Sequence, residues 1–196
     1  SRYAYVLTDR ELVIQLQKGD LAALGDLFDR HQRLVFRTAV GITGDEQVAS
    51  DLSQDVFLRM HRFAHHIDPD RPLEPWLYRT TANLTYTWIK RHNRWFRPLE
   101  DVAEWLAGSK KQSPVFLTEA DEEWQDMKKA IASLSLQQRV VVVLYYINDL
   151  SLQEISEILD VPVGTIKSRL FYGRQALKKY LETGNKGQVE ANYEFT

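Results

Sequence analysis

The sequence predicts an all-α fold of two small helical domains joined by a linker. Apolar residues recur at steps of three and four in most segments, which is the spacing of one helix face. Two segments open with the capping-box signal for a helix start, a hydroxyl residue three positions before a glutamate, at Thr8 and at Ser151. One run, Val140 to Val143, favours a strand by local propensity. No partner strand is evident nearby, so we expect a buried helix from Leu136 to Ile147.

Three helices are expected in the first 63 residues. The first runs from Thr8 to Lys18 and the second from Leu21 to Thr43. Gly44 and Asp45 form a turn signal before the third helix, which runs from Asp45 to Phe63. Opposite its apolar face this third helix carries charged and polar side chains, namely Asp51, Gln54, Asp55 and Arg59.

Residues 64–75 interrupt the helical pattern, because Pro69, Pro72 and Pro75 are incompatible with a regular helix interior. A helix resumes from Trp76 to Trp95. Its outer face interleaves aromatic and basic side chains, which suits single-stranded nucleic acid because rings stack on unpaired bases and cations follow phosphates. We assign Trp76 and Trp88 to the core, and spacing alone leaves the nucleic-acid interpretation of the other residues open here. The outer residues are Arg79, Asn83, Tyr86, Lys90, Arg91 and Arg94.

Residues 98–118 have the composition of a linker, with proline, glycine and serine interrupting any long helix. Residues 98–127 carry two basic and eight acidic groups. Residues 63–97 carry six basic and three acidic groups, and residues 162–186 carry six basic and one acidic. Since distribution matters more than the net charge of −2, we expect nucleic acid to be held at two places with an acidic segment between them.

Residues 151–181 predict a helix-turn-helix. A short apolar helix starts at Ser151 and must stop near Asp160, because Pro162 restricts the residue before it and suits the first turn of the next helix. Charge alone would favour a solvated basic helix, but the cap, the proline and the apolar first helix together favour the DNA-binding motif. The second helix presents polar, basic and aromatic residues outward, namely Thr165, Lys167, Ser168, Arg169, Phe171, Tyr172 and Arg174.

Composition restricts the class of protein further. The chain has no cysteine, which removes disulfides and thiolate chemistry. No apolar run reaches the length that crosses a bilayer, and the first ten residues lack a signal-peptide core. We therefore expect a cytoplasmic protein.

Two other functions are compatible with parts of the sequence. His61 and His65 stand four residues apart, with His66, Asp68 and Asp70 close by, and such residues can ligate zinc. A polar loop edge explains them better, since no second ligand cluster or catalytic motif is evident. The second alternative is an operator-binding helix-turn-helix regulator, which would need a dimerising or sensory N-terminal half.

Three segments carry a resemblance to a known family. They are DLSQDVFLRM at 51–60, RPLEPWLYRTTANL at 71–84 and LSLQEISEILDVPVGTIKSRLFYGRQAL at 150–177. In this order, the chain resembles a bacterial RNA polymerase sigma factor of the extracytoplasmic-function (ECF) group. The resemblance implies a sigma-2 domain at 1–97, an acidic linker at 98–118, a sigma-4 helix-turn-helix domain at 119–183 and a tail at 184–196 outside the pattern.

The resemblance also implies that the chain is not an enzyme and needs no cofactor or metal, and it implies partners. The helix at 45–63 would bind the coiled coil of the largest polymerase subunit through the residues around Asp51, and the sigma-4 domain would sit on the flap of the second-largest subunit. The loop at 64–75 and the following helix would read the −10 promoter element, with Asn83 helping to hold a flipped base. In the helix-turn-helix, the outward residues of the second helix would read the −35 element. Tyr172 stands where the family commonly has a basic residue. Many family members are held by an anti-sigma factor, and nothing in the sequence identifies one.

Overall fold

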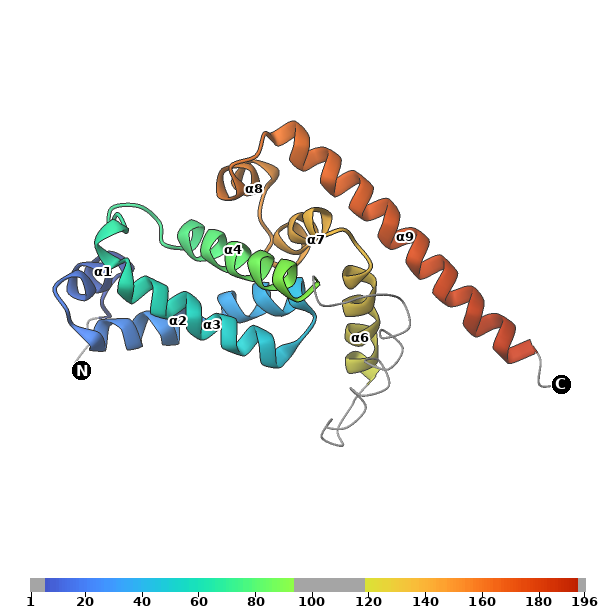
Figure 1. Ribbon diagram of the computed structural model, residues 1–196, viewed down its shortest axis with the longest axis horizontal. Coiled ribbons are helices and arrows are strands. Elements are labelled where there is room, and N and C mark those ends of the chain that lie inside the picture. Colours follow the sequence, from blue (N-terminus) through green and yellow to red (C-terminus); the bar gives the residue numbers. More distant parts are fainter. Residues whose placement is uncertain (1–5, 94–118, 194–196) are drawn as a thin grey trace.

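The computed structural model describes residues 6–93 and 119–193, and every regular element in these ranges is helical (Figure 1). The all-α prediction is therefore confirmed. The first unit comprises α1 (Asp9–Gln17), α2 (Leu21–Thr43), α3 (Glu46–Arg62), the short 3-10 turn η1 (Ala64–His66) and α4 (Glu74–Asn93). The second comprises α6 (Glu119–Ala132), α7 (Leu136–Val142), the π-helical turn η2 (Val143–Ile147), α8 (Leu152–Leu159) and α9 (Val163–Tyr193). No helix in the described ranges is both long and apolar enough to cross a membrane.

The helix boundaries follow from local side chains. Thr8 caps α1 in a complete capping box with Glu11, and Asp45 accepts a hydrogen bond from the backbone N–H of Val48 at the start of α3. Gly44 ends α2 in the left-handed conformation, at a φ of 71°. These helices lie where the sequence predicts them.

The segment after α3 is more ordered than the sequence suggests. A 3-10 turn occupies residues 64–66, and α4 begins at Glu74, two residues before the predicted start. The predicted boundary is wrong because Pro75 falls in the first turn of α4, where no backbone N–H is needed for the helix.

The valine run is helical, as expected against its propensity. Val140 to Val143 are buried in α7 and at the start of η2, where burial outweighs the preference of branched side chains for strands. α9 packs against this run at Gly173, where a Cβ atom would lie 3.0 Å from a methyl carbon of Val142. Glycine at this position therefore permits close approach of the two helices.

The two units pack against each other, which the sequence analysis does not anticipate. One core cluster contains Ile42 and Tyr78 of the first unit together with Val143 and Leu144 of the second. α8 packs on α4, while α6, α7 and η2 pack on α2; in Figure 1 α8 and α7 lie beside α4. A separate cluster fills the first unit between α1, α2, α3 and α4.

α9 is longer than predicted. The expected helix reaches residue 181, and the predicted tail begins at 184, whereas the helix continues to Tyr193. In Figure 1 its C-terminal part extends away from the rest of the molecule.

Candidate nucleic-acid and polymerase interfaces

The helix-turn-helix is built from a short, tightly defined α8. The Ser151 hydroxyl accepts a hydrogen bond from the Glu154 backbone N–H at 3.1 Å, and the Glu154 carboxylate accepts one from the Ser151 backbone N–H at 2.7 Å. This backbone hydrogen bond lowers the pKa of Glu154. Asp160 ends the helix in the left-handed conformation, at a φ of 54°. Residue 160 therefore turns the chain into α9.

α9 begins directly after Pro162. The Pro162 carbonyl accepts hydrogen bonds from the N–H groups of Thr165 and Ile166, so the hydrogen bonding of α9 starts at the proline, one residue before the first residue of the helix. Ile166 and Leu170 are buried against α8, whose Ile155 is fully buried. The apolar contacts fix which face of α9 points outward.

That outward face carries the predicted −35 residues. Phe171 and Tyr172 are 57% and 58% exposed, and their rings contact each other edge-on with centroids 5.4 Å apart. The Ser168 hydroxyl donates to the Gly164 carbonyl at 3.1 Å. Arg169 is half-buried. The other residues of the predicted set are exposed, namely Thr165, Lys167, Ser168 and Arg174.

The predicted −10 residues form a row along α4. Lys90 lies over the Tyr86 ring, with its Nζ atom 4.8 Å from the ring centroid, which joins a cation to an aromatic face. Asn83, Lys90 and Arg91 are exposed. Arg94, the last residue of the predicted set, lies outside the described residues. The structure thus brings five of the six onto one helix.

Arg79 has partners that the sequence does not reveal. Its Nε atom donates to the Ile158 carbonyl at 2.9 Å, and its Nη2 atom donates to the Glu157 carbonyl at 2.6 Å. Both carbonyls belong to the last turn of α8, where helical hydrogen bonding leaves acceptors free. Arg79 therefore connects the predicted −10 surface to the helix-turn-helix.

The loop before α4 is anchored to α1. The Gln17 side-chain amide donates to the carbonyls of Ala64 and Ile67, each at 2.9 Å. Arg10 and Asp70 form an exposed ion pair at 2.7 Å, and the hydrogen bond that Arg10 donates to Asp70 raises the pKa of Arg10. Leu73 is buried below the loop. These contacts hold the predicted promoter-reading loop in a fixed position beside α1.

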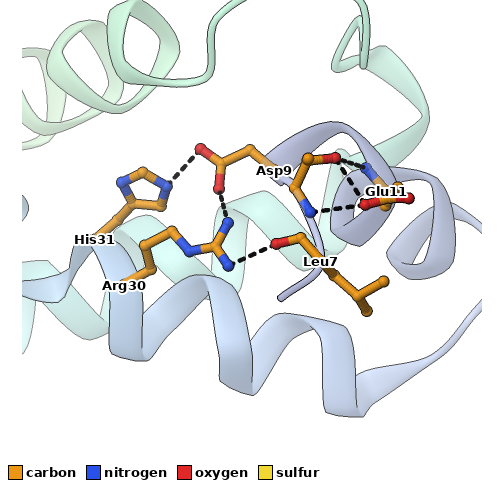
Figure 2. Close-up of polar contacts among 6 residues, drawn as sticks. Leu7, Asp9, Glu11, Arg30 and His31 are labelled. Carbon is orange, nitrogen blue, oxygen red and sulfur yellow. Dashed lines mark hydrogen bonds and ion pairs between the residues drawn. The ribbon is translucent and has the colours of Figure 1, made fainter. Parts of the chain in front are cut away.

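A buried histidine stabilises the same end of the molecule. Figure 2 shows Asp9 between Arg30 and His31, with carboxylate oxygens 2.6 Å from Arg30 Nη1 and 2.8 Å from His31 Nε2. Arg30 also donates to the Leu7 carbonyl at 2.7 Å. The network joins α1 to α2, so its role is structural. The sequence analysis missed His31, although its spacing of four from the buried Leu27 and Val35 could have placed it on the inner face.

The same histidine belongs to the one group of potential metal ligands found within the described ranges, which comprises Asp9, His31 and Glu74. The possible zinc ligands considered from the sequence, around His61 and His65, do not form such a group within the described ranges. In the group that is present, the Asp9 carboxylate already pairs with Arg30 and His31. An arginine at this distance competes with a cation, so the group is explained as an ion-pair network.

The predicted polymerase surface lies on α3. Asp51, Gln54, Asp55 and Arg59 are all exposed, and Leu58 beside them is 62% exposed. An apolar groove runs between α2 and α3 next to Gln54, lined by Leu24, Phe28, Phe57 and Leu58. Acidic groups beside an exposed leucine and an apolar groove form the kind of surface that binds another protein.

Comparisons with known proteins agree with this geometry. The family model for sigma-70 region 2 matches residues 27–95, and the model for sigma-70 region 4 matches residues 124–177. The chain is 31% identical over 183 residues to the ECF RNA polymerase sigma factor SigW of Bacillus subtilis, covering 88% of this chain and 96% of the relative. It is 33% identical over 168 residues to the ECF sigma factor SigE of Mycolicibacterium smegmatis, covering 83% of this chain and 64% of that protein.

Solved structures share the fold. A structure of CnrH in complex with the cytosolic domain of CnrY superimposes with a TM-score of 0.65 at 24% identity, covering 89% of this chain and 97% of that one. The sigma factor RpoE from Bartonella quintana, solved with the anti-sigma factor NepR, gives a TM-score of 0.62 at 22% identity, covering 81% and 96%. On the two matched sigma regions and the identity to SigW, the chain belongs to the extracytoplasmic-function group of RNA polymerase sigma factors.

Proposed function

We propose that this chain binds core RNA polymerase and directs it to promoters by reading a −35 and a −10 element. The observation that carries the proposal is that one chain of this family presents two separate basic and aromatic faces, on α4 and on α9. Residues 1–97 are assigned to polymerase binding and −10 recognition, residues 98–118 to the linker and residues 119–183 to −35 recognition. The chain makes and breaks no bond in this role, and it acts in the cytoplasm, where polymerase is.

The −35 assignment is supported by the outward face of α9. Lysine, serine and aromatic side chains near the start of such a helix can reach base edges in the major groove, while Arg169 and Arg174 can meet phosphates. The −10 assignment is supported by Asn83, which has an exposed amide, and by the Tyr86–Lys90 pair, which offers a ring for an unpaired base beside a cation for a phosphate.

Polymerase contact is assigned to α3 and the adjoining groove, with the coiled coil of the largest subunit as the partner. Since the groove beside Gln54 is apolar and its rim is charged, it suits an amphipathic helical partner. The flap of the second-largest subunit is assigned to the second unit. An anti-sigma factor is a further candidate partner, because the sigma factor RpoE, which shares this fold, was solved with the anti-sigma factor NepR.

Tethering explains why two small faces suffice. Each face alone offers a small basic footprint and binds DNA weakly. When both are held on polymerase, the second contact becomes intramolecular, and the effective concentration raises the overall affinity by about 10²- to 10⁴-fold. Capture of unstacked bases at the −10 element then offsets the cost of unpairing, about a few kcal/mol per flipped base.

The test is run-off transcription with purified bacterial core polymerase on a pool of promoter fragments, with and without the chain. Specific transcripts that appear only with the chain support the proposal, and their start sites give both promoter elements. Absence of any polymerase binding would contradict it.

A double variant tests the polymerase surface. Asp51→Ala with Asp55→Ala should weaken binding to core polymerase by about tenfold, because two exposed charges near the apolar groove are lost. Circular dichroism should show an unchanged helical signal. The control, Glu123→Ala with Asp126→Ala, removes two exposed carboxylates from α6 and should leave the affinity unchanged. Equal affinities for both variants would remove α3 from the interface.

A further inference from the structure

The surface that joins the two units is specific and largely polar at its edges. Arg139 of α7 donates to the Ile42 carbonyl at 3.1 Å, and the Asn148 amide donates to the Thr38 hydroxyl at 2.9 Å. Burial lowers the pKa of Arg139, as expected for a guanidinium held by carbonyls and away from water. Arg37 donates to the Ile147 carbonyl at 3.3 Å. Side chains from both units thus satisfy backbone acceptors across the junction.

The centre of this surface is apolar and closely packed. At Gly41 of α2 a Cβ atom would lie 2.9 Å from a methyl carbon of Val143 and 3.0 Å from the end of Ile147. The three atoms nearest to that position all belong to the second unit. Tyr78 is buried in the same cluster, and burial raises its pKa. Close packing around a glycine indicates complementary surfaces and not a loose encounter.

This junction covers part of the proposed −10 surface. Arg79 already donates to two carbonyls at the end of α8, where a cation is also favoured by the helix dipole. Asn83 and Tyr86 line a cavity whose opposite wall is formed by Leu159, Val161 and Arg169 of the second unit. While α8 holds Arg79, its Nε and Nη2 donors are occupied and do not bind a DNA strand.

The same arrangement is incompatible with reading both promoter elements at once. Elements centred at −10 and −35 lie about 25 base pairs apart, which is about 85 Å of duplex at roughly 3.4 Å per pair. We call the arrangement in this structure, with the two units packed together, the closed form. In it, Asn83 and Tyr86, assigned to the −10 element, and Arg169, assigned to the −35 element, line one cavity. The 25 residues between the described ranges could span at most about 80 to 90 Å when extended, so chain length permits separation.

We infer that the second unit acts as an internal competitor of promoter DNA: it binds the −10 surface of the first unit, with Arg79 as the residue that α8 and DNA share. This inference rests on the proposed function for the identity of the −10 surface. Promoter reading then requires that the α4–α8 and α2–η2 contacts separate. Most of the −35 face of α9 is exposed in the closed chain. On the −10 face, Asn83, Lys90 and Arg91 are also exposed, whereas Arg79 is held by α8 and Tyr86 is half-buried beside the second unit.

The variant Gly41→Leu separates the units without removing any proposed DNA contact. The new side chain collides with Val143 and Ile147 across the junction. Gly25→Leu is the matched control, because Gly25 lies on the same helix and a Cβ atom there meets nothing within 4 Å. Arg79→Ala is a second route to opening that keeps the apolar packing, in case the larger side chain perturbs α2.

The experiment measures opening directly. Since the chain lacks cysteine, Lys18→Cys and Gln153→Cys place one dye on each unit at exposed positions outside the assigned surfaces. Energy transfer in the free, labelled full chain should be high for the parent and Gly25→Leu, and should fall for Gly41→Leu and, to a smaller extent, for Arg79→Ala. Low transfer in the parent, equal to that of Gly41→Leu, would overturn the inference.

DNA binding is the second readout, with a labelled single-stranded 20-mer of random sequence as the probe. If the closed form holds 90 to 99% of the parent chain, opening should raise the apparent affinity of Gly41→Leu by roughly 10- to 100-fold, since affinity scales with the competent fraction. Separation of the units with unchanged oligonucleotide affinity would overturn the competition. Neither readout uses polymerase, so failure of run-off transcription would reject the proposed function while leaving the closed state to be judged by energy transfer.

Discussion

The two helices assigned to DNA reading, α4 and α9, differ in what lies against their reading faces. On α9 the aromatic pair Phe171 and Tyr172 is more than half exposed. On α4, Arg79 is held by the end of α8, and Asn83 and Tyr86 face the second unit across a cavity. Two similar basic and aromatic faces thus differ in how accessible they are to DNA. Their accessibility depends on the neighbouring unit and not on the side chains of the helix itself.

The helices also differ in how they are supported. α9 rests on α8 and α7 through Ile155, Ile166 and Val142, in a cluster that also includes residues of the first unit. α4 belongs to two clusters: Tyr78, Ala82 and Ile89 lie in the cluster that supports α9, and Leu77 lies in the separate cluster of the first unit. Damage to the cluster of the first unit should therefore affect α4 before α9, whereas damage to the shared cluster should affect both helices.

The largest effect is expected from removal of a fully buried core side chain. Ile155→Ala should lower the free energy of unfolding by about 2 to 5 kcal/mol, because it removes buried methyl groups and leaves a cavity. Urea unfolding measures the loss, and hydrogen exchange locates it. Protection should fall mainly in α7 to α9. The paired variant Leu27→Ala, also fully buried, should lower protection mainly in α1 to α3. An equal loss everywhere in both variants would mean that the two clusters are one cooperative unit.

The exposed face of α9 should be sensitive to a single charge. Lys167→Ala should weaken binding to a −35 duplex in the polymerase complex by about 1 to 3 kcal/mol, as expected for loss of one base or phosphate contact. The duplex sequence comes from the run-off start sites, and fluorescence anisotropy measures the affinity. Lys179→Ala removes the same charge from an exposed position on the same helix outside the assigned set. If both variants lose the same affinity, α9 acts only as a general basic surface.

A substitution on the face of α4 that is assigned to the −10 element should affect a different step of initiation, the melting of promoter DNA. Asn83→Ala should slow formation of the melted promoter complex by roughly tenfold while leaving polymerase affinity unchanged, because the amide is assigned to an unpaired base. Permanganate footprinting of unpaired thymines measures melting. Gln153→Ala, which removes an exposed amide from α8, serves as the control. Normal melting in Asn83→Ala would exclude this residue from the −10 contact.

The smallest effect concerns the capping boxes that both units share. Ser151→Ala should cost about 1 kcal/mol of stability through loss of the α8 cap, and Thr8→Ala should cost about the same at α1. Only Ser151→Ala should reduce protection of the helix-turn-helix in hydrogen exchange.

The α8 cap also has a pH signature. Because the hydrogen bond from the Ser151 backbone lowers the pKa of Glu154 in the folded chain, its contribution is present above the ordinary carboxyl value of 4.5 and is lost as the pH falls through the lowered value. Unfolding midpoints measured between pH 3 and 7 should show this acid loss in the parent chain. Glu154→Gln, which cannot titrate, should lack that component. An identical pH profile for the two would remove the carboxylate from the cap.

Local sequence signals predicted most of the helices. The capping boxes at Thr8 and Ser151, the left-handed turn at Gly44 and the spacing of apolar residues act within a few residues of each other, so they can be found without the fold. The outward faces of α3 and α9 follow from the same spacing, because residues opposite an apolar stripe must point to solvent.

Contacts between distant segments could not be found in this way. The pairing of Arg79 with α8 joins residues 79 positions apart, and the packing at Gly41 joins α2 to η2. Neither contact can be predicted from the spacing of residues along the chain. An arginine on an outer helix face, or a glycine inside a helix, occurs for many different reasons. The sequence alone determined most of the helices, their caps and which side chains each helix presents on its outer face. Only the tertiary structure decided that the second unit holds Arg79 and lies beside Asn83 and Tyr86, because contact between two units depends on shape complementarity across the whole surface.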